Sequence, residues 1–332
     1  MGRHQVKETG AVTFGASGVT FYIRFKGSQL KAVMGDQLRG SSNYNWFTVK
    51  VDEREPIRFR TRQGKRTYTL ADSLDPGAHR VVLSKATEGQ NGWNSLIEFK
   101  AGELLKADSL PERKIEFIGN SITSGYGLDT QAIPCSVGTW FDQHHAWYAY
   151  GPLLARRLDA QWMLSSVSGI GMHRNWDSPE PVMPDVYQGI YMDYKDTTSQ
   201  WHFDRYTPDL VVIALGTNDF SDGDGDQPRP ELDGKAFVEQ YTTFTSRVRR
   251  NYPRAEILLA NSPLLNSAKN SKLSSYLERV IENRKDEGDN KLHLFRFRDR
   301  YPEGCDGHPG KQAHKVMTDS LEPHIRTIMG WQ

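Results

Sequence analysis

The hydrophobic pattern of the chain changes once, near residue 112. Before this point, apolar residues alternate with polar ones or form short runs, separated by turns rich in Gly, Pro, Asp and Asn. After it, short apolar runs alternate with segments whose apolar residues recur every three or four positions. The first pattern is typical of antiparallel strands and the second of alternating strands and helices. A chain of 332 residues has room for two domains, and the change of pattern predicts two of different classes.

The first domain, residues 1–107, is predicted to be an antiparallel β-sandwich. Turn signals such as Asp75-Pro76-Gly77 and Asn91-Gly92 separate its strands, and no long helical pattern interrupts them. Short strands at this spacing are typical of a sandwich. The expected strands are 19–25, 30–34, 46–51, 57–62, 68–70, 79–83 and 96–100.

The second domain, residues 112–332, is predicted to be an α/β domain with a parallel sheet covered by helices on both faces. The expected strands are 115–118, 162–165, 210–215, 257–260 and 292–297, and the expected helices are 146–158, 237–248, 276–281 and 313–325. Pro152 is expected to kink the first helix or delay its start, and Pro323 to interrupt the last one. Ligands of such sheets bind beyond the carboxyl ends of the strands.

Composition narrows the partners of the protein. The 42 Lys and Arg residues nearly balance the 41 Asp and Glu residues, and the net charge of +1 argues against binding nucleic acid through a broad basic face. The longest apolar run, 210–215, is far shorter than the roughly 18 residues of a membrane span. We therefore expect neither a nucleic-acid partner nor a membrane span, and make no prediction of the oligomeric state.

The cysteines and the N-terminus bear on the compartment. Cys135 and Cys305 allow one disulfide at most, and a small packing residue is the simpler interpretation of Cys305. The residues that follow Met1 lack the apolar stretch of a signal peptide. We expect a secreted or periplasmic protein whose signal peptide is absent from this chain, with a cytoplasmic location as the alternative.

A nucleophile candidate, Ser121, stands just beyond the first strand of the second domain, after Gly119-Asn120. A serine hydroxyl can attack a carbonyl if a base takes its proton and N–H groups face the developing oxyanion. The alternative is that Ser121 only caps the following helix. A base candidate, His308, follows the fifth strand, and imidazole is suited to proton transfer near neutral pH.

Oxyanion donors are expected at the ends of the second and third strands. Gly169 or Gly171 can offer a backbone N–H group, and Asn218 can offer its side-chain amide. Each is also an ordinary turn residue. Their common position at one edge of the predicted sheet, together with Ser121 and His308, favours the functional interpretation.

Four blocks of sequence resemble the SGNH/GDSL hydrolases in order and spacing. They are Gly119-Asn120-Ser121, Gly169, Gly216-Thr217-Asn218-Asp219 and Asp306-Gly307-His308-Pro309. The chain is similar above all to carbohydrate esterase family 2, whose members are acetyl esterases of plant-polysaccharide breakdown. The resemblance implies an α/β fold: a three-layer SGNH (flavodoxin-like) parallel-sheet domain behind an N-terminal β-sandwich of jelly-roll type.

The resemblance also implies the roles of single residues. Ser121 would be the nucleophile and His308 the general acid/base, while the N–H groups of Ser121 and Gly169 and the side chain of Asn218 would form the oxyanion hole. The chain departs from the family pattern at Asn120, where Asp is usual, and at Cys305, where an acidic residue is usual. Either the Asp306 carboxylate or a backbone carbonyl would then orient His308.

The implied reaction is removal of acetyl groups from plant cell-wall polysaccharide or oligosaccharide, with no metal or organic cofactor. The alternatives are an SGNH esterase for other short-chain acyl esters and a non-catalytic carbohydrate-binding protein. Trp176 and Trp201 are candidates for stacking on sugar rings, because both follow strands in long loops.

Two segments have a weak metal-binding character. His144 and His145 lack further ligands at a suitable spacing and are predicted to be polar surface residues. Residues 222–226 begin like a calcium loop, but Gln227 replaces the glycine of the sharp turn and Asp233 replaces the bidentate glutamate. We therefore predict no metal site.

Overall fold

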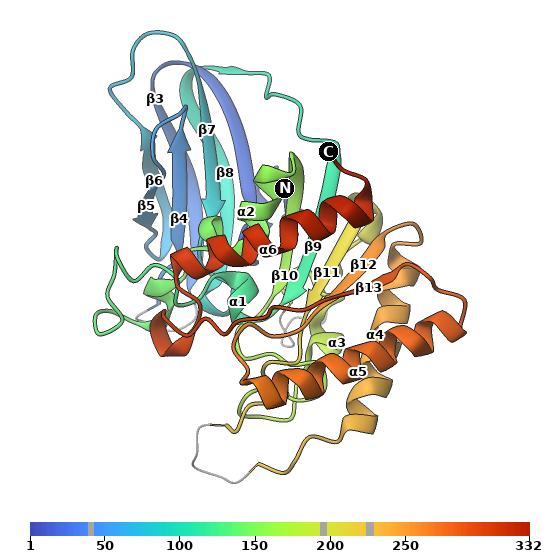
Figure 1. The fold of residues 1–332 in the computed structure, drawn as a ribbon. Coiled ribbons are helices and arrows are strands. Elements are labelled where there is room, and N and C mark those ends of the chain that lie inside the picture. The colour runs from blue at the N-terminus through green and yellow to red at the C-terminus, as the bar shows by residue number, and fades with distance from the viewer. Residues whose placement is uncertain (39–42, 193–197, 224–228) are drawn as a thin grey trace.

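The computed structural model describes residues 1–38, 43–192, 198–223 and 229–332. An antiparallel sheet built by the N-terminal third stands beside a five-stranded parallel sheet with helices on both faces (Figure 1). The predicted fold class is therefore confirmed. No helix among the described residues is long and apolar enough to cross a membrane.

The N-terminal sheet is antiparallel throughout. Its strands follow the order β1-β2-β8-β3-β7-β4-β5, and β6 pairs with β3 off this path. The strands are β1 (Gln5–Val6), β2 (Val12–Phe14), β3 (Thr20–Leu38), β4 (Trp46–Val51), β5 (Ile57–Arg60), β6 (Gly64–Ala71), β7 (Ala78–Lys85) and β8 (Gly92–Leu105). A short 3-10 helix, Gly89–Asn91, joins β7 to β8.

The structure corrects one strand prediction in this sheet. The expected strands 19–25 and 30–34 are one long strand, β3, with a register shift between Lys26 and Leu30. Gly27 lies there at φ +134°, a backbone conformation open mainly to glycine, so the strand bends without ending. The first part of β3 pairs with β7 and the second part with β6.

The parallel sheet has the strand order β10-β9-β11-β12-β13. Its strands are β9 (Arg113–Gly119), β10 (Ala160–Ser166), β11 (Leu210–Ala214), β12 (Glu256–Ala260) and β13 (Leu292–Phe295). The chain runs outward from β9 to β10 and then crosses back to β11, so the order reverses between β9 and β11. In open α/β sheets, ligands bind beyond the carboxyl ends of the strands at such a reversal.

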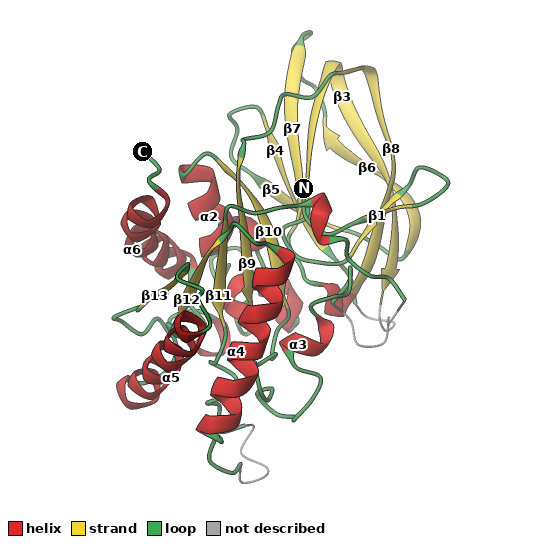
Figure 2. Ribbon diagram, turned by 90° about the vertical axis from the view of Figure 1, so that its right-hand side faces the viewer, coloured by secondary structure: helices red, strands yellow, loops and turns green. Residues whose placement is uncertain are grey.

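Helices cover both faces of this sheet (Figure 2). The α-helices are α1 (Ser121–Ser124), α2 (Tyr150–Arg157), α3 (Met183–Val186), α4 (Gly234–Asn251), α5 (Ser267–Asp286) and α6 (Lys311–Met329). Further 3-10 helices are Trp140–Gln143, Ala146–Tyr148, Phe203–Arg205 and Cys305–Gly307. Val212 packs in the same buried cluster as α2 and α6, whereas its neighbour Val211 packs with α4 and α5. Successive residues of a strand thus bury opposite faces, which explains the continuous apolar runs of the sequence.

The two prolines behave differently from each other. Pro152 lies in the first turn of α2, which begins at Tyr150, so the predicted late start is confirmed. The prediction for Pro323 is wrong, because α6 continues through it without a break. Leu321 and Ile325 on either side of the proline are fully buried, and this packing sustains the helix.

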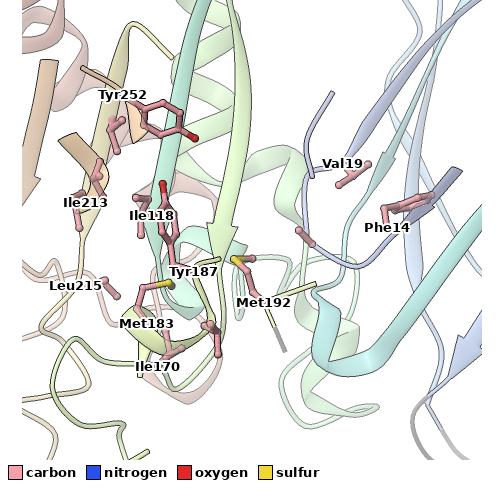
Figure 3. Close-up of a cluster of buried hydrophobic side chains, with 14 of the residues drawn as sticks. Phe14, Val19, Ile118, Ile170, Met183, Tyr187, Met192, Ile213, Leu215 and Tyr252 are labelled. Carbon is pink, nitrogen blue, oxygen red and sulfur yellow. The ribbon is translucent and has the colours of Figure 1, made fainter. Parts of the chain in front are cut away.

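One buried cluster joins the two sheets (Figure 3). It runs from Phe14 of the N-terminal sheet and Val19, just before β3, to Ile118 and Ile213 of the parallel sheet. The buried guanidinium group of Arg3 also forms an ion pair with Glu116 on β9, at 3.2 Å. The division into domains at residues 107 and 112 stays a prediction, and one buried cluster spans both parts.

Candidate active site

Ser121 lies at the first turn beyond β9, as its position at a strand end predicts. Asn120 is the N-cap of α1, and its side-chain oxygen accepts the N–H of Ile122 at 3.1 Å. The helix is therefore capped by Asn120 rather than by Ser121, and an Asn serves as well as the usual Asp. The Ser121 side chain is 7% exposed, and its hydroxyl is left to face the base.

Ser121 and His308 meet although 187 residues separate them in sequence. The Ser121 Oγ lies 2.8 Å from His308 Nε2. His308 lies on the segment between β13 and α6. The Tyr301 N–H of this segment donates to the Pro263 carbonyl beyond β12 at 2.9 Å, and this contact holds the segment beside the carboxyl ends of the strands. The distance between Ser121 Oγ and His308 Nε2 is short enough for direct proton transfer from the hydroxyl to the imidazole.

A disulfide anchors the histidine segment. Cys135 and Cys305 are bonded to each other, and the Cys305 N–H donates to the Gly127 carbonyl at 3.0 Å. The interpretation of Cys305 as a small packing residue is therefore wrong. The bond links the segment that carries His308 to the loop that follows α1, so both catalytic candidates are held by one framework.

His308 is oriented by a backbone carbonyl in this geometry. Its Nδ1 lies 3.3 Å from the backbone oxygen of Asp306. The Asp306 carboxylate instead accepts the hydroxyl of Tyr126, whose ring meets the imidazole edge-on at 4.6 Å between centroids. Of the two candidates for orienting His308, this geometry favours the backbone carbonyl over the Asp306 carboxylate.

The pKa of His308 is lowered from its ordinary value, mainly because burial disfavours the charged imidazolium. Hydrogen bonds to the carbonyls of Asp306 and Cys305, and the charge of Asp306, act in the opposite direction. The imidazole is therefore neutral near pH 7. With its Nδ1–H directed at the Asp306 carbonyl, Nε2 is the free acceptor for the Ser121 hydroxyl proton.

The expected oxyanion donors lie around the same point. Gly169 has φ +77°, and a Cβ atom there would come within 2.7 Å of the Trp176 ring, so only glycine fits. The Asn218 amide donates one hydrogen to the Ile170 carbonyl at 2.7 Å and keeps its second hydrogen available. Within the described part of the chain, the backbone N–H groups of Ser121 and Gly169 have no hydrogen-bond acceptor, so both can donate to an oxyanion.

These residues line a cavity of about 600 Å³. Its walls are Gln90, Ser121, Tyr126, Trp140, Ser168, Gly169, Trp176, Asn218, Ser221, Asp306 and His308. The sequence interpretation did not select five of these residues: Tyr126, Trp140, Ser168, Ser221, and Gln90, which comes from the N-terminal domain. All other members follow the ends of β9, β10, β11 and β13.

The tryptophans divide into two kinds. Trp176 is 40% exposed and lines the cavity, as does Trp140, which is 38% exposed. The prediction for Trp201 is wrong, because this side chain is only 4% exposed and lies in a separate buried cluster. There it packs beside the guanidinium groups of Arg3 and Arg205.

The adjacent histidines are buried rather than solvated. Burial lowers the pKa of His144 to about 3 and that of His145 to about 4, and His145 Nδ1 lies 2.7 Å from Asp129 Oδ2. No group of three or more metal-binding side chains occurs among the described residues. Asp224 and Asp226 of the weak calcium-loop pattern lie outside those residues.

The fold and this cluster define a class: a serine hydrolase of SGNH type, with its candidate site at the reversal point of a flavodoxin-like sheet. Residues 1–111 match the family model described as "Carbohydrate esterase 2 N-terminal", and residues 117–316 match the "GDSL-like Lipase/Acylhydrolase family". The chain belongs to the GDSL-like lipases/acylhydrolases and, within them, to carbohydrate esterase family 2.

The similar proteins compared below match this chain over 88–98% of their own length. An acetylxylan esterase / glucomannan deacetylase of Cellvibrio japonicus is 31% identical over 100% of this chain and 88% of its own. The structure of a family two carbohydrate esterase from Clostridium thermocellum in complex with cellohexaose is 31% identical, with a TM-score of 0.89 over 100% of this chain and 98% of that one. A family two carbohydrate esterase from Cellvibrio japonicus has a TM-score of 0.88 at 31% identity, over 100% and 95% of the two chains.

Proposed function

We propose that this protein is a carbohydrate O-acetyl esterase that removes acetyl groups from plant cell-wall polysaccharide or its oligosaccharides. The observation that carries the proposal is the 2.8 Å contact between Ser121 Oγ and His308 Nε2 at the wall of a cavity that also holds Gly169 and Asn218. A nucleophile, a neutral base and oxyanion donors around one point are what acyl transfer from an ester requires.

The first half of the reaction forms an acetyl-enzyme. Ser121 attacks the acetyl carbonyl while His308 takes the hydroxyl proton on Nε2. The negative charge that develops on the carbonyl oxygen is received by the N–H groups of Ser121 and Gly169 and by the Asn218 amide. His308 then gives its proton to the departing sugar oxygen, and the deacetylated sugar leaves.

The second half repeats these steps with water. His308 removes a proton from a water molecule, which attacks the acetyl group on Ser121. The same donors receive the second oxyanion, and acetate leaves as His308 returns the proton to the Ser121 oxygen. The carbonyl of Asp306 accepts the Nδ1–H of both the neutral and the protonated imidazole, so that this orientation does not depend on a carboxylate partner.

A sugar substrate fits the rim of the cavity. Trp140 and Trp176 expose part of their rings there, and aromatic faces are suited to stacking on the apolar faces of sugar rings. The named activities of the relatives, acetylxylan esterase and glucomannan deacetylase, and the cellohexaose bound to one family member point to the same substrate class.

Acetate release from acetylated xylan and acetylated glucomannan tests the proposal. The wild-type protein should release acetate from at least one of them, and Ser121→Ala should release none at an unchanged melting temperature. Hydrolysis of aryl acetate and butyrate without release from either polysaccharide would favour an esterase for other short-chain esters. A wild-type protein that binds the polysaccharide but hydrolyses no ester would be a carbohydrate-binding protein.

We further propose that the protein works in an oxidising compartment outside the cytoplasm. The Cys135–Cys305 disulfide supports this, because such bonds persist in secreted and periplasmic proteins and are rare in the cytosol. Mass spectrometry of the protein isolated from its own cells without reductant tests it. Free thiols at both positions would contradict the proposed location.

A further inference from the structure

The N-terminal domain holds the backbone next to the oxyanion hole from two sides. Glu88 Oε2 accepts the N–H of Ser168 at 2.8 Å. Two residues later in the chain, the Gln90 side-chain amide donates to the Ser168 carbonyl at 2.9 Å. Both side chains come from the turn between β7 and β8, and Ser168 directly precedes Gly169.

The peptide between Ser168 and Gly169 has special importance. A trans peptide is planar, and its C=O and N–H groups point in opposite directions. A donor that fixes the direction of the Ser168 carbonyl therefore also fixes the direction of the Gly169 N–H. That N–H is the group to which the proposed function assigns the oxyanion.

The Ile170 N–H donates to the Val167 carbonyl at 3.4 Å and closes a β-turn around this peptide, but the central peptide of a β-turn can take either of two orientations. Rotation of the peptide changes φ of Gly169, and glycine adopts positive and negative φ almost equally well. Gly169 stands at φ +77°. The peptide that follows is held separately, because the Gly169 carbonyl accepts the Trp176 N–H at 3.0 Å. Gln90 contacts the preceding peptide directly, through the Ser168 carbonyl, and Glu88 holds the peptide before that, through the Ser168 N–H.

We propose that Glu88 and Gln90 are positioning residues that aim the Gly169 N–H into the oxyanion hole, so that the N-terminal domain is part of the catalytic apparatus. The proposal rests on the proposed esterase function. It assigns these two side chains an effect on the transition state rather than on binding of the sugar.

Glu88 is itself rigidly held. Its side chain is 1% exposed, and its backbone carbonyl accepts the buried Lys85 ammonium at 3.0 Å. The same carboxylate oxygen that receives the Ser168 N–H also accepts the Ser124 hydroxyl at 3.1 Å. Ser124 is the last residue of α1, the helix that begins with the nucleophile. One oxygen atom thus ties together the two segments that carry Ser121 and Gly169.

Gln90→Met is the main test, because Gln90 is exposed and methionine keeps its length while removing the donor. With an aryl acetate, which has no sugar, kcat should fall about tenfold while KM and the melting temperature stay unchanged, since small misplacements at a reacting centre cost large factors in rate. The same factor should appear in acetate release from a sugar ester. Gln63→Ala, an exposed glutamine elsewhere in the same domain, is the matched control.

A sulfur probe separates positioning from a general structural effect. An aryl thionoacetate places sulfur, a weak hydrogen-bond acceptor, where the oxyanion forms. The wild-type protein should prefer the oxygen ester strongly, and Gln90→Met should reduce this preference. In the buried position, Glu88→Gln keeps an acceptor for the Ser168 N–H and should retain most activity, whereas Glu88→Met should lose more than tenfold.

The outcomes distinguish the two levels of the proposal. A wild-type protein that hydrolyses no acetate ester would overturn the proposed function and the positioning role with it. An active wild-type protein whose Gln90→Met variant is unchanged would overturn the positioning role alone. A change confined to KM for sugar esters would also overturn the positioning role, because it would show that Gln90 contacts the sugar. Equal losses of activity on the oxygen and sulfur esters would overturn it as well.

Discussion

Tyr126 donates its hydroxyl to the Asp306 carboxylate, and this turns the acidic group nearest to His308 in sequence away from the imidazole. The backbone oxygen of the same residue faces His308 Nδ1 instead. Asp306 stands at φ +51°, an uncommon conformation for a residue other than glycine. Asp306 thereby supplies its backbone carbonyl to His308 and its carboxylate to Tyr126, whose ring packs against the His308 imidazole.

Asp306→Asn should reduce kcat/KM less than tenfold, because the carbonyl that orients His308 is retained and Asn can still accept the Tyr126 hydroxyl. General acid/base groups that are lost altogether cost about 10²–10⁴-fold. Initial rates with an aryl acetate measure the effect. A loss of a hundredfold or more would show that the carboxylate orients the imidazole during the reaction.

The pH dependence follows from the direction of the His308 pKa shift. The base acts in its neutral form, and burial lowers its pKa below 6.5. The acid limb of the activity profile should therefore be centred below pH 6.5, where the imidazole takes up a proton. The Asp306 charge raises the pKa of His308, so removal of this charge should move the acid limb to still lower pH. A wild-type limb centred above pH 6.5 would contradict the assignment.

Asn218→Ala should lower kcat by about 10²–10³-fold, the usual effect of removing one oxyanion donor. The variant also leaves the Ile170 carbonyl without its partner, so the free energy of unfolding should fall by about 1 kcal/mol. Denaturant unfolding separates the two effects. Equal kcat in variant and wild type would exclude Asn218 from the oxyanion hole.

The disulfide should contribute to both stability and activity. The double variant Cys135→Ser/Cys305→Ser opens a covalent loop with a sequence separation of 170, and such bonds contribute about 2–4 kcal/mol. We expect a lower midpoint of unfolding and a lower kcat, because His308 loses the covalent link of its segment. Treatment of the wild-type protein with a reductant is the matched comparison, and unchanged activity in both would contradict the anchoring role.

Trp176→Ala and Trp201→Ala should have opposite profiles. The first should raise KM for acetylated oligosaccharide about threefold to tenfold, consistent with the loss of one aromatic contact, and leave hydrolysis of aryl acetate unchanged. The second removes a buried side chain and should destabilise the protein by about 3–5 kcal/mol with little effect on KM. A KM effect at Trp201 would contradict its placement in the buried cluster.

Periodicity predicted the fold well because it reports burial directly. The five strands of the parallel sheet were expected from apolar runs, and those runs exist because helices cover both faces. Strand ends then predicted where Ser121, Gly169, Asn218 and His308 meet, since parallel strands present their carboxyl ends at one edge. The bend in β3 escaped this reasoning, because a glycine within a strand and a glycine in a turn have the same pattern.

The rest of the site depends on contacts between distant segments. Glu88 and Ser168 are 80 residues apart, and Tyr126 and Asp306 are 180 apart, and no local pattern indicates either pair. The prediction for Trp201 failed for the same reason. Its position in a loop predicted an exposed side chain, but the distant N-terminal segment with Arg3 covers it. A site is thus predictable where strand topology brings its residues together, and not where side chains from another domain complete it.

The buried cluster that runs from Phe14 to Ile213 has a consequence for how the protein unfolds. Because both parts of the chain bury apolar side chains in this cluster, we expect that neither part unfolds while the other stays folded. Heating should unfold the protein in a single cooperative transition. A truncated protein without the first hundred residues would expose to water the apolar side chains of the parallel-sheet part that pack against the N-terminal sheet. Replacement of the N-terminal domain during evolution would therefore have to preserve the apolar contacts of this shared cluster.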